Sequence, residues 1–389
     1  MVASYHPRRF RFVANVVVAI VPTLCLLLMA EVVVRLTGAA NSCPDVMNPE
    51  IWSCDPILGY TNRHDIVVYG KPLNKAGFRT HEFVPKAPGA FRILALGDSC
   101  TFGYVALDEG WVVEEPYPQV LERLAADRLE PGKVEVLNAG VAGYNSFNGL
   151  MLLRLWLRSL APDLVTVRFG WNDHFVWSGA DVGTTFHEPS NPISLEAEDF
   201  LLRTALYPFA RRLGMELRFR LNGTPKPGVG RVPKRWVPTI PLPDYQHNLR
   251  RTVEVARSHG ARVWLLTAPD ALLGEDALRR YEELPPEATA RRAVTLNALP
   301  SFRQLMEVHA SYVAATREVG NETGVPIVDM AAIYRQHAEE RLFSVSDVVH
   351  PTQIGHEFEA EVLLERLVAD GLIQLRTAQQ ATSSSTASR

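Results

Sequence analysis

The sequence has little net charge, few cysteines and no internal repeat. Its 389 residues carry a formal net charge of −3, which gives no general attraction to nucleic acid. No segment resembles a nucleic-acid-binding module, and the lack of a fixed repeat excludes solenoids and propellers. The sequence also has no metal-binding motif of the H-E-x-x-H kind. A chain of this length has room for one large domain or two modest ones.

One long apolar run stands near the N-terminus. After Arg8, Arg9 and Arg11 comes the segment 12–34, FVANVVVAIVPTLCLLLMAEVVV. As a helix this segment would be about 34 Å long, which is enough to cross a hydrocarbon core about 30 Å thick. We therefore predict a transmembrane helix over 12–34, with residues 1–11 in the cytoplasm and the rest of the chain in the periplasm. The alternative is a cleaved signal peptide, whose apolar region is normally shorter, at about 7–15 residues.

The four cysteines fit an extracytoplasmic location. Cys25 lies in the apolar run and Cys100 follows Ser99. Cys43 and Cys54 lie just beyond the apolar run, where an oxidising compartment permits a disulfide. The spacing alone leaves two interpretations open, a Cys43–Cys54 disulfide or two separate thiols.

From residue 91 onward, apolar strand candidates alternate with helix candidates. The predicted strands are 91–96, 133–138, 164–169, 261–269 and 325–330, and the predicted helices are 117–129, 148–160, 247–260, 301–320 and 353–370. This alternation predicts an α/β fold with a parallel sheet covered by helices on both faces. Segments 174–243 and 271–299 interrupt the pattern, and we expect them to be insertions that shape a binding site. Residues 35–90 are interpreted as a lead-in, and 371–389 as a disordered tail.

A serine directly follows the first predicted strand. Ser99 lies in LGDSCTF, residues 96–102, and parallel sheets hold their reactive groups at the carboxyl ends of strands. Near the C-terminus, FSVSDVVHPTQIGHEF places Asp347 and His350 three residues apart. A serine nucleophile needs a base, and the base needs an orienting partner, so these three residues fit the three roles. Alone, D-x-x-H could instead cap a helix starting near Thr352 or bind a metal.

Acyl transfer also requires hydrogen-bond donors for a developing oxyanion. Gly140 follows the second predicted strand in NAGVAGYN and could offer its backbone N–H. Asn172 follows the third predicted strand in FGWND and could donate from its side-chain amide. The alternative interpretations are a turn glycine and an Asx-turn.

These blocks together resemble a known family. GDSCTFG with Ser99, NAGVAG with Gly140, GWND with Asn172 and DVVH with His350 occur in the order found in SGNH hydrolases, also called GDSL-type esterases and lipases. The resemblance covers about residues 91–370. The lead-in NKAGFRTHEF and the apolar run also resemble a membrane-anchored, extracytoplasmic bacterial branch of the family. The resemblance implies a flavodoxin-like, three-layer α/β/α fold with a mainly parallel sheet.

The resemblance also implies a role for each site residue. Ser99 would attack an ester carbonyl, His350 would move the proton, and Asp347 would orient the imidazole. The oxyanion would be bound by the backbone N–H groups of Ser99 and Gly140 and by the Asn172 amide. No cofactor or metal is implied.

Four neighbouring residues receive lesser roles. Cys100 stands where related sequences often carry an aromatic residue, and we interpret it as a packing residue. Asp173 and His174 are expected to border the site. His356 lies on the closing helix and is expected to be structural.

The leading functional prediction is a membrane-anchored periplasmic esterase that removes acyl groups from carbohydrate or lipid of the cell envelope. Two alternatives stay open: an O-acetyltransferase with the same triad, and an SGNH-like accessory subunit of a larger membrane protein complex with catalysis incidental or lost. The predicted partners are an acyl-ester substrate and the membrane, with a membrane protein complex under the last alternative, and no nucleic acid.

Overall fold

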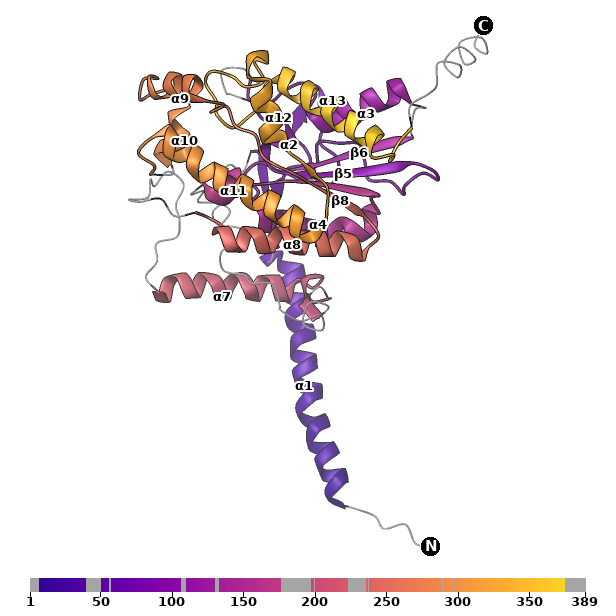
Figure 1. The fold of residues 1–389 in the computed structure, drawn as a ribbon. Helices are drawn as coiled ribbons and strands as arrows, with labels where there is room; N and C mark the ends of the chain where they lie inside the picture. The colour runs from indigo at the N-terminus through magenta and orange to yellow at the C-terminus, as the bar shows by residue number, and fades with distance from the viewer. Residues whose placement is uncertain are drawn as a thin grey trace. The chain divides into compact units, whose positions relative to one another are not determined.

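The computed structural model describes most of the chain, and Figure 1 shows its elements. The described residues are 7–39, 50–55, 57–105, 110–129, 133–175, 197–198, 200–222, 236, 238–288, 290–296 and 298–374. The chain divides into two compact units, which we describe separately. The first unit consists of 1–45, 54–60 and 187–225, and the second of 46–53, 61–186 and 226–389.

The first unit is built on two helices, α1 (Pro7–Thr37) and α7 (Leu206–Asn222). Helix α1 contains the whole predicted segment 12–34 and extends beyond it at both ends. Glu31 forms an ion pair with Arg35 at 2.5 Å and also accepts the backbone N–H groups of Ala205 and Leu206, at 2.9 and 2.7 Å. The first N–H groups of a helix have no intrahelical partner, so Glu31 caps the start of α7.

The second unit is organised around a five-stranded sheet in the order β6-β5-β7-β8-β9. The strands are β5 (Phe91–Gly97), β6 (Val134–Gly140), β7 (Leu164–Arg168), β8 (Arg262–Leu266) and β9 (Ile327–Val328). All four neighbouring pairs are parallel, which confirms the α/β fold class. Two short two-stranded sheets precede it in the chain, β1 (Trp52–Asp55) with β2 (Gly59–Asn62) and β3 (Val67–Val68) with β4 (Lys71–Pro72).

Helices cover both faces of the sheet, as the alternation of strands and helices predicts. Helices α3 (Tyr117–Arg128) and α13 (Gln353–Ala369) pack against each other on one face. Helices α4 (Ser146–Leu160), α8 (Leu242–Ser258) and α11 (Phe302–Thr323) pack together on the other (Figure 1). The core between the sheet and the first pair is apolar, with Ile93, Ala95 and Val136 of the sheet buried against Leu121 and Leu364. This burial supplies the main stabilisation of the domain.

The remaining helices are short. They are α2 (Ser99–Phe102), α5 (Trp171–His174), α9 (Glu275–Glu282), α10 (Arg291–Leu296), α12 (Met330–Gln336) and the 3-10 helix Ala338–Glu340. The segment 271–299, expected to be an irregular insertion, therefore contains α9 and α10, and the insertion 174–243 contains α7.

Several predictions fall at or beyond the limits of the described residues. Much of 174–243 and the tail from residue 375 lie outside them. Residues 371–374 of the segment interpreted as a tail are described, and Ile373 is buried in the core. Cys43 lies outside the described residues, and so do both interpretations of Cys43 and Cys54, a disulfide or two separate thiols.

The order of the sheet brings together the loops that follow β5, β6 and β7. Strand β5 lies between β6 and β7, and Gly97 at its carboxyl end is in register with Gly140 on one side and Arg168 on the other. The chain leaves β5 toward β6 on one side and reaches β7 on the opposite side of β5, so β5 is a topological switch point. The segments carrying Ser99 and Asn172 thus begin at the same edge.

Candidate active site

The serine stands at the start of a tight turn between strand β5 and helix α2. Asp98 caps this turn by accepting a backbone N–H at 2.9 Å, and Gly103 ends it with a φ of +96°. A Cβ on Gly97 would lie 2.1 Å from Thr101 Oγ1, so only glycine fits there. The sequence GDSCTFG therefore builds a compact strand-turn-helix that holds Ser99 at the sheet edge.

The structure brings Ser99, His350 and Asp347 into one hydrogen-bonded chain. Ser99 Oγ lies 2.9 Å from His350 Nε2, and His350 Nδ1 lies 2.7 Å from Asp347 Oδ2. Asp347 Oδ1 accepts the backbone N–H groups of Val349 and His350, at 2.8 and 3.2 Å. The His350 side chain is 23 % exposed, so the chain of groups is open to a substrate.

The partners of His350 determine its tautomer. A carboxylate only accepts hydrogen bonds, so His350 Nδ1 carries the proton toward Asp347 and Nε2 is left to accept from the Ser99 hydroxyl. Burial by itself would lower the pKa of His350, but the charge and hydrogen bond of Asp347 outweigh it and raise the pKa above its ordinary value. The reverse balance holds for Asp347, where burial raises the pKa but His350 and the backbone donors lower it overall.

Buried polar contacts hold the histidine loop against the sheet. Tyr281 donates its hydroxyl hydrogen to the Ser344 carbonyl at 2.9 Å, and the backbone N–H of Ala271 donates to Val348 at 3.1 Å. The Cys100 thiol donates to the Val349 carbonyl at 3.5 Å. Cys100 is buried, and burial raises the pKa of its thiol well above the ordinary value, which agrees with a packing residue rather than a nucleophile.

The predicted oxyanion donors differ in whether their N–H groups are already hydrogen-bonded. Asn172 lies on α5, four residues past the end of β7, and its Nδ2 donates to the Tyr144 carbonyl at 3.0 Å, which fixes the amide. Its second contact, to Asp98 Oδ2, is long at 3.5 Å. The backbone N–H of Ser99 makes no hydrogen bond within the described part of the chain.

The structure does not present the Gly140 N–H as a free donor. Gly140 is buried at the end of β6, and its N–H donates to Asn138 Oδ1 at 2.9 Å. A Cβ on Gly140 would lie 2.2 Å from the backbone nitrogen of Phe102, so this glycine allows close packing against α2. Gly143 in the same loop is half-exposed, has a φ of +82° and makes no N–H hydrogen bond among the described residues. The sequence feature that could have indicated Gly143 as a donor is its position as the last residue of NAGVAG.

Asp173, His174 and His356 are buried and carry structural contacts. Asp173 accepts the backbone N–H groups of Ser146 and Gly170, at 2.9 and 3.0 Å, and burial raises its pKa to about 7. His356 Nδ1 accepts the backbone N–H of Tyr117 at 3.1 Å, which agrees with its expected structural role. His174 faces a second histidine in the interior and does not border the site.

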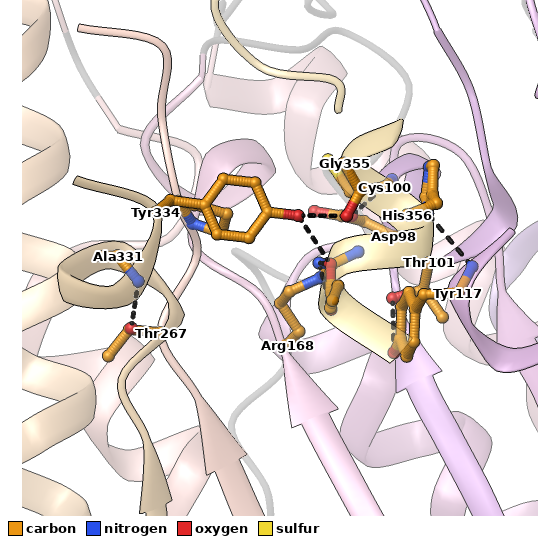
Figure 2. Close-up of polar contacts among 12 residues, drawn as sticks. Asp98, Cys100, Thr101, Tyr117, Arg168, Thr267, Ala331, Tyr334, Gly355 and His356 are labelled. Carbon is orange, nitrogen blue, oxygen red and sulfur yellow. Dashed lines mark hydrogen bonds and ion pairs between the residues drawn. The ribbon is translucent and has the colours of Figure 1, made fainter. Parts of the chain in front are cut away.

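A buried polar layer lies beneath the nucleophile turn, and Figure 2 shows Arg168 in it, with Tyr334 and Tyr117 nearby. The guanidinium of Arg168 lies 4.8 Å from the centre of the Tyr117 ring and pairs with Glu359 Oε1 at 2.6 Å. The Tyr334 hydroxyl donates to the Gly355 carbonyl at 2.8 Å. Glu359 and Gly355 lie on α13, so the ion pair fastens the helix that follows His350 to strand β7, and the Tyr334 hydrogen bond fastens it to α12.

Comparisons with known proteins give one sequence match and several distant structural ones. A model described as the GDSL-like lipase/acylhydrolase family matches residues 95–358, more than half of the chain, including Ser99 and His350. No curated protein matches the chain. Among solved structures, a lipase/acylhydrolase from Enterococcus faecalis is 19% identical with a TM-score of 0.43, covering 74% of this chain and 100% of that chain.

The acetylxylan esterase Axe2 from Geobacillus stearothermophilus is 16% identical with a TM-score of 0.38, covering 71% of this chain and 94% of that chain. The enzyme LAE5 from the metagenome of Lake Arreo, Spain, titled an alpha/beta hydrolase, is 16% identical with a TM-score of 0.39, covering 73% of this chain and 98% of that chain.

Proposed function

The chain belongs to the GDSL-like lipase/acylhydrolase family and is a serine ester hydrolase, and we propose that it removes acyl groups from carbohydrate or lipid esters outside the cytoplasm. Ser99 is the nucleophile, His350 the general base and acid, and Asp347 the residue that orients the imidazole. The observation that carries this proposal is the continuous chain from Ser99 Oγ through His350 to Asp347, with distances of 2.9 and 2.7 Å.

The reaction proceeds in two halves. Ser99 Oγ attacks the ester carbonyl carbon while its proton passes to His350 Nε2. The tetrahedral intermediate then collapses, the bond to the alcohol oxygen breaks, and His350 gives its proton to that oxygen. Water attacks the acyl-serine in the same way, with His350 as base, and releases the acid and free Ser99. Asp347 stays ionised and stabilises the imidazolium formed in each half.

The oxyanion needs donors that are free before substrate binds. We assign this role to the backbone N–H of Ser99, the backbone N–H of Gly143 and the second amide hydrogen of Asn172, whose contact with Asp98 is long at 3.5 Å. The Gly140 N–H already donates to Asn138, so Gly143 replaces it in this assignment. Fixed donors of this kind stabilise the charge that develops in the transition state without having to reorganise.

Helix α1 supports the proposed membrane anchor. Its large apolar side chains are exposed around the helix, including Val18, Leu24, Leu28 and Leu36, at 50% or more of their accessible surface. A helix that is apolar all round requires an apolar surrounding, which a bilayer provides. A signal sequence near the N-terminus meets the same criteria of length and composition. We propose an anchor over 12–34 with the basic residues before it in the cytoplasm, and a catalytic domain over 91–370.

The catalytic proposal is tested by labelling the full-length protein with a fluorophosphonate and measuring hydrolysis of p-nitrophenyl acetate. Both signals should be present in the wild type and absent in Ser99→Ala. The matched control is Cys100→Ala, which removes the neighbouring thiol and should keep the labelling. Labelling that persists in Ser99→Ala, or a folded wild type that neither labels nor turns over, would refute the assignment.

The location is tested separately. A C-terminal alkaline phosphatase fusion should be active and a C-terminal fusion to green fluorescent protein dark, because only the former folds outside the cytoplasm. The intact mass of the purified protein should include residues 1–39. A mass that begins near residue 40 would replace the anchor with a cleaved signal sequence.

A further inference from the structure

We propose that Tyr104 and Trp111 form a subsite for the alcohol part of the ester and that this alcohol is a sugar ring. We call this pair the aromatic shelf. The inference rests on the proposed esterase function, because it uses the side of His350 from which the alcohol leaves.

The two rings form a line that leads to the proposed catalytic imidazole. The Trp111 and Tyr104 rings meet edge to face, with centroids 5.5 Å apart and planes at 76°. The Tyr104 ring in turn lies 6.3 Å from the His350 ring. Both aromatic residues are half-buried, so each keeps part of its ring surface open.

The shelf is built directly onto the nucleophile turn. The backbone N–H of Tyr104 donates to the Ser99 carbonyl at 2.9 Å, which fixes this residue relative to the nucleophile. The chain then returns alongside itself, with Val105 N–H donating to Trp111 at 3.1 Å and Val113 N–H to Gly103 at 2.8 Å. Any displacement of the shelf would therefore disturb the turn that holds Ser99.

A buried arginine holds the base of the shelf. Arg79, from the lead-in segment NKAGFRTHEF, donates to the carbonyls of Phe102, Val113 and Glu114, at 3.1, 2.6 and 2.9 Å. Burial lowers the pKa of Arg79 to about 10, which still leaves it charged at neutral pH. Charged donors make stronger hydrogen bonds than neutral ones, so three carbonyls from two separate segments are held in place.

The backbone at Trp111 has a conformation that is unusual for a bulky residue. Its φ is +64°, in the left-handed region that a bulky side chain rarely adopts. Tyr69 also has a positive φ, of +48°, but Tyr69 and Gly70 form the two-residue turn between β3 and β4, where positive φ is required. Trp111 follows Gly110, which has a φ of +101°, and it packs on the apolar cluster that includes Val112 while staying half-exposed. Backbone strain of this kind clusters at ligand sites, and here it places an indole beside Tyr104.

The chemistry of the reaction decides which half of the ester meets the shelf. His350 Nε2 gives its proton to the oxygen of the leaving alcohol, so the alcohol lies on the side of His350. Tyr104 flanks that imidazole, and Trp111 extends the same surface outward. The shelf therefore contacts the alcohol, while the acyl group remains on the side of the oxyanion donors.

The form of the surface favours a sugar over a linear lipid alcohol. The rings lie against a cluster of the buried residues Val68, Leu73, Phe102 and Val112 and the half-buried Ile66, so the shelf has an apolar base. A pyranose ring has an apolar face of C–H groups that can lie on an aromatic ring, while its hydroxyls stay in water. A long alkyl chain gains its binding energy from enclosure on several sides, whereas the two rings meet edge to face and offer flat ring faces.

The test compares three acetates that share the acyl group and differ in the alcohol: methyl acetate, a monoacetylated methyl glucoside and octyl acetate. The wild-type full-length protein should have its highest kcat/KM on the sugar ester. Trp111→Leu and Tyr104→Leu should each lower the ratio of kcat/KM for the sugar ester to that for methyl acetate by about 10-fold, through a higher KM. Trp156→Leu is the matched control, because Trp156 is a half-buried tryptophan that packs on Phe78 and Phe83, and it should leave the ratio unchanged.

A binding measurement separates this proposal from the catalytic one. The monoacetylated methyl glucoside should bind calorimetrically to Ser99→Ala and about 10-fold more weakly to the Ser99→Ala variant that also carries Trp111→Leu. Trp111→Phe keeps an aromatic ring at this position and should retain most of the binding. This result would show that the loss in Trp111→Leu comes from the missing ring and not from a folding defect. A preference for octyl acetate that Trp111→Leu removes, or sugar binding that does not respond to either ring, would overturn the proposal. Sugar binding without hydrolysis of any ester would refute the esterase function and leave the shelf intact.

Discussion

The Arg168 guanidinium and the Glu359 carboxylate form an ion pair in the interior, with both side chains at most 2 % exposed and an Nη1–Oε1 distance of 2.6 Å. Arg168 ends strand β7 and Glu359 lies in the second turn of α13, so the pair joins the sheet to the helix that follows His350. Ser99 and His350 are 251 residues apart in the chain, and their contact depends on interactions that, like this ion pair, hold α13 against the sheet.

The environment of the pair makes it costly to break. The Tyr334 hydroxyl, whose hydrogen is donated to the Gly355 carbonyl, lies 3.4 Å from Glu359 Oε2, and the Tyr117 ring covers the guanidinium. Two Arg168 nitrogens, Nε and Nη2, have no hydrogen-bond partner among the described residues. Glu359 is thus the main compensation for a buried positive charge.

Arg168→Met should destabilise the full-length protein by about 3–5 kcal/mol, because it leaves the Glu359 carboxylate buried without its partner. For a domain of this size the melting temperature should fall by roughly 6–20 °C, measured by intrinsic fluorescence in detergent. Adding Glu359→Gln should recover part of the loss, since the uncompensated charge is then removed.

The control is Arg279→Met, which breaks an exposed ion pair with Asp276 whose side chains are 70% and 91% exposed. Its melting temperature should change by under about 2 °C. If Arg168→Met has an equally small effect, the pair does not hold α13 to the sheet.

The raised pKa of His350 predicts the acid limb of the activity profile. His350 must be neutral to accept the Ser99 proton, so kcat/KM should fall as the pH drops through the His350 pKa. Asp347 raises that pKa, so the limb should lie above the ordinary histidine value of about 6.5. Asp347→Asn should shift the limb to lower pH and reduce kcat by about 10⁴-fold, because the useful tautomer is lost.

The exposed carboxylate Asp276, on α9, provides the control for this profile. Asp276→Asn should leave the limb and kcat where they are in the wild type. A limb that Asp347→Asn does not move would mean that a different group sets the pKa of the base.

Asn172→Ala should lower kcat by about 10²–10³ and leave KM nearly unchanged, since an oxyanion donor acts mainly in the transition state. The measurement is steady-state hydrolysis of p-nitrophenyl acetate, together with the rate of fluorophosphonate labelling. Asn248→Ala is the matched control, because Asn248 is also a buried asparagine but donates to Ser146 Oγ on α4. A loss below about threefold for Asn172→Ala would remove this residue from the oxyanion site.

The layers of the fold were predictable because the signals that set them are local. Apolar runs such as 91–96 and 164–169 mark strands, and their alternation with helices leaves few topologies other than a parallel sheet. Residues that follow such strands then meet at one edge, which brings Ser99 and Asn172 together. Family resemblance added the order of the four blocks.

The parts that were missed depend on contacts distant in sequence or on weak local signals. Arg168 belongs to the run LVTVRF, and its partner Glu359 is 191 residues away, so no local pattern reveals the ion pair. Helix α7 lies in the segment 174–243 that we expected to be an insertion, and it has Pro208 at its third position, where the first turn of a helix tolerates proline. Helices α9 and α10 have eight and six residues, too few for a periodic signal. The Gly140 N–H was unavailable because the Asn138 side chain folds back to accept it.

A buried histidine pair predicts how stability changes with pH. His309 Nε2 donates to the Ala268 carbonyl at 2.9 Å, so its Nδ1 accepts from His174 Nε2, 3.0 Å away, and both imidazoles are neutral. Burial lowers the pKa of both, and the neighbouring His309 lowers that of His174 further. Below about pH 6.5 both imidazoles bind a proton in the unfolded chain but stay neutral in the folded chain, so the free energy of unfolding falls as the pH drops.

Each of these histidines should cost about 1 kcal/mol of stability between pH 6.5 and 5.5. Asp173 acts in the opposite direction, because its pKa of about 7 means that the folded state gains a proton first. The contribution of the histidine pair is therefore measured by comparing the wild type with a double variant that carries His174→Leu and His309→Phe, because Asp173 is the same in both proteins. The drop in melting temperature from pH 6.5 to 5.5 should be smaller in the variant by about 4–8 °C.

His247→Gln is the control for this comparison, because His247 is exposed on α8, and its drop should equal that of the wild type. Phe at position 309 keeps a ring against Trp171, whose indole stacks on His309 with centroids 3.9 Å apart. A double variant with the same drop as the wild type would mean that at least one of the two imidazoles is already protonated in the folded state. The hydrogen bond between them would then need a charged donor, and the Ala268 carbonyl would no longer determine the tautomer.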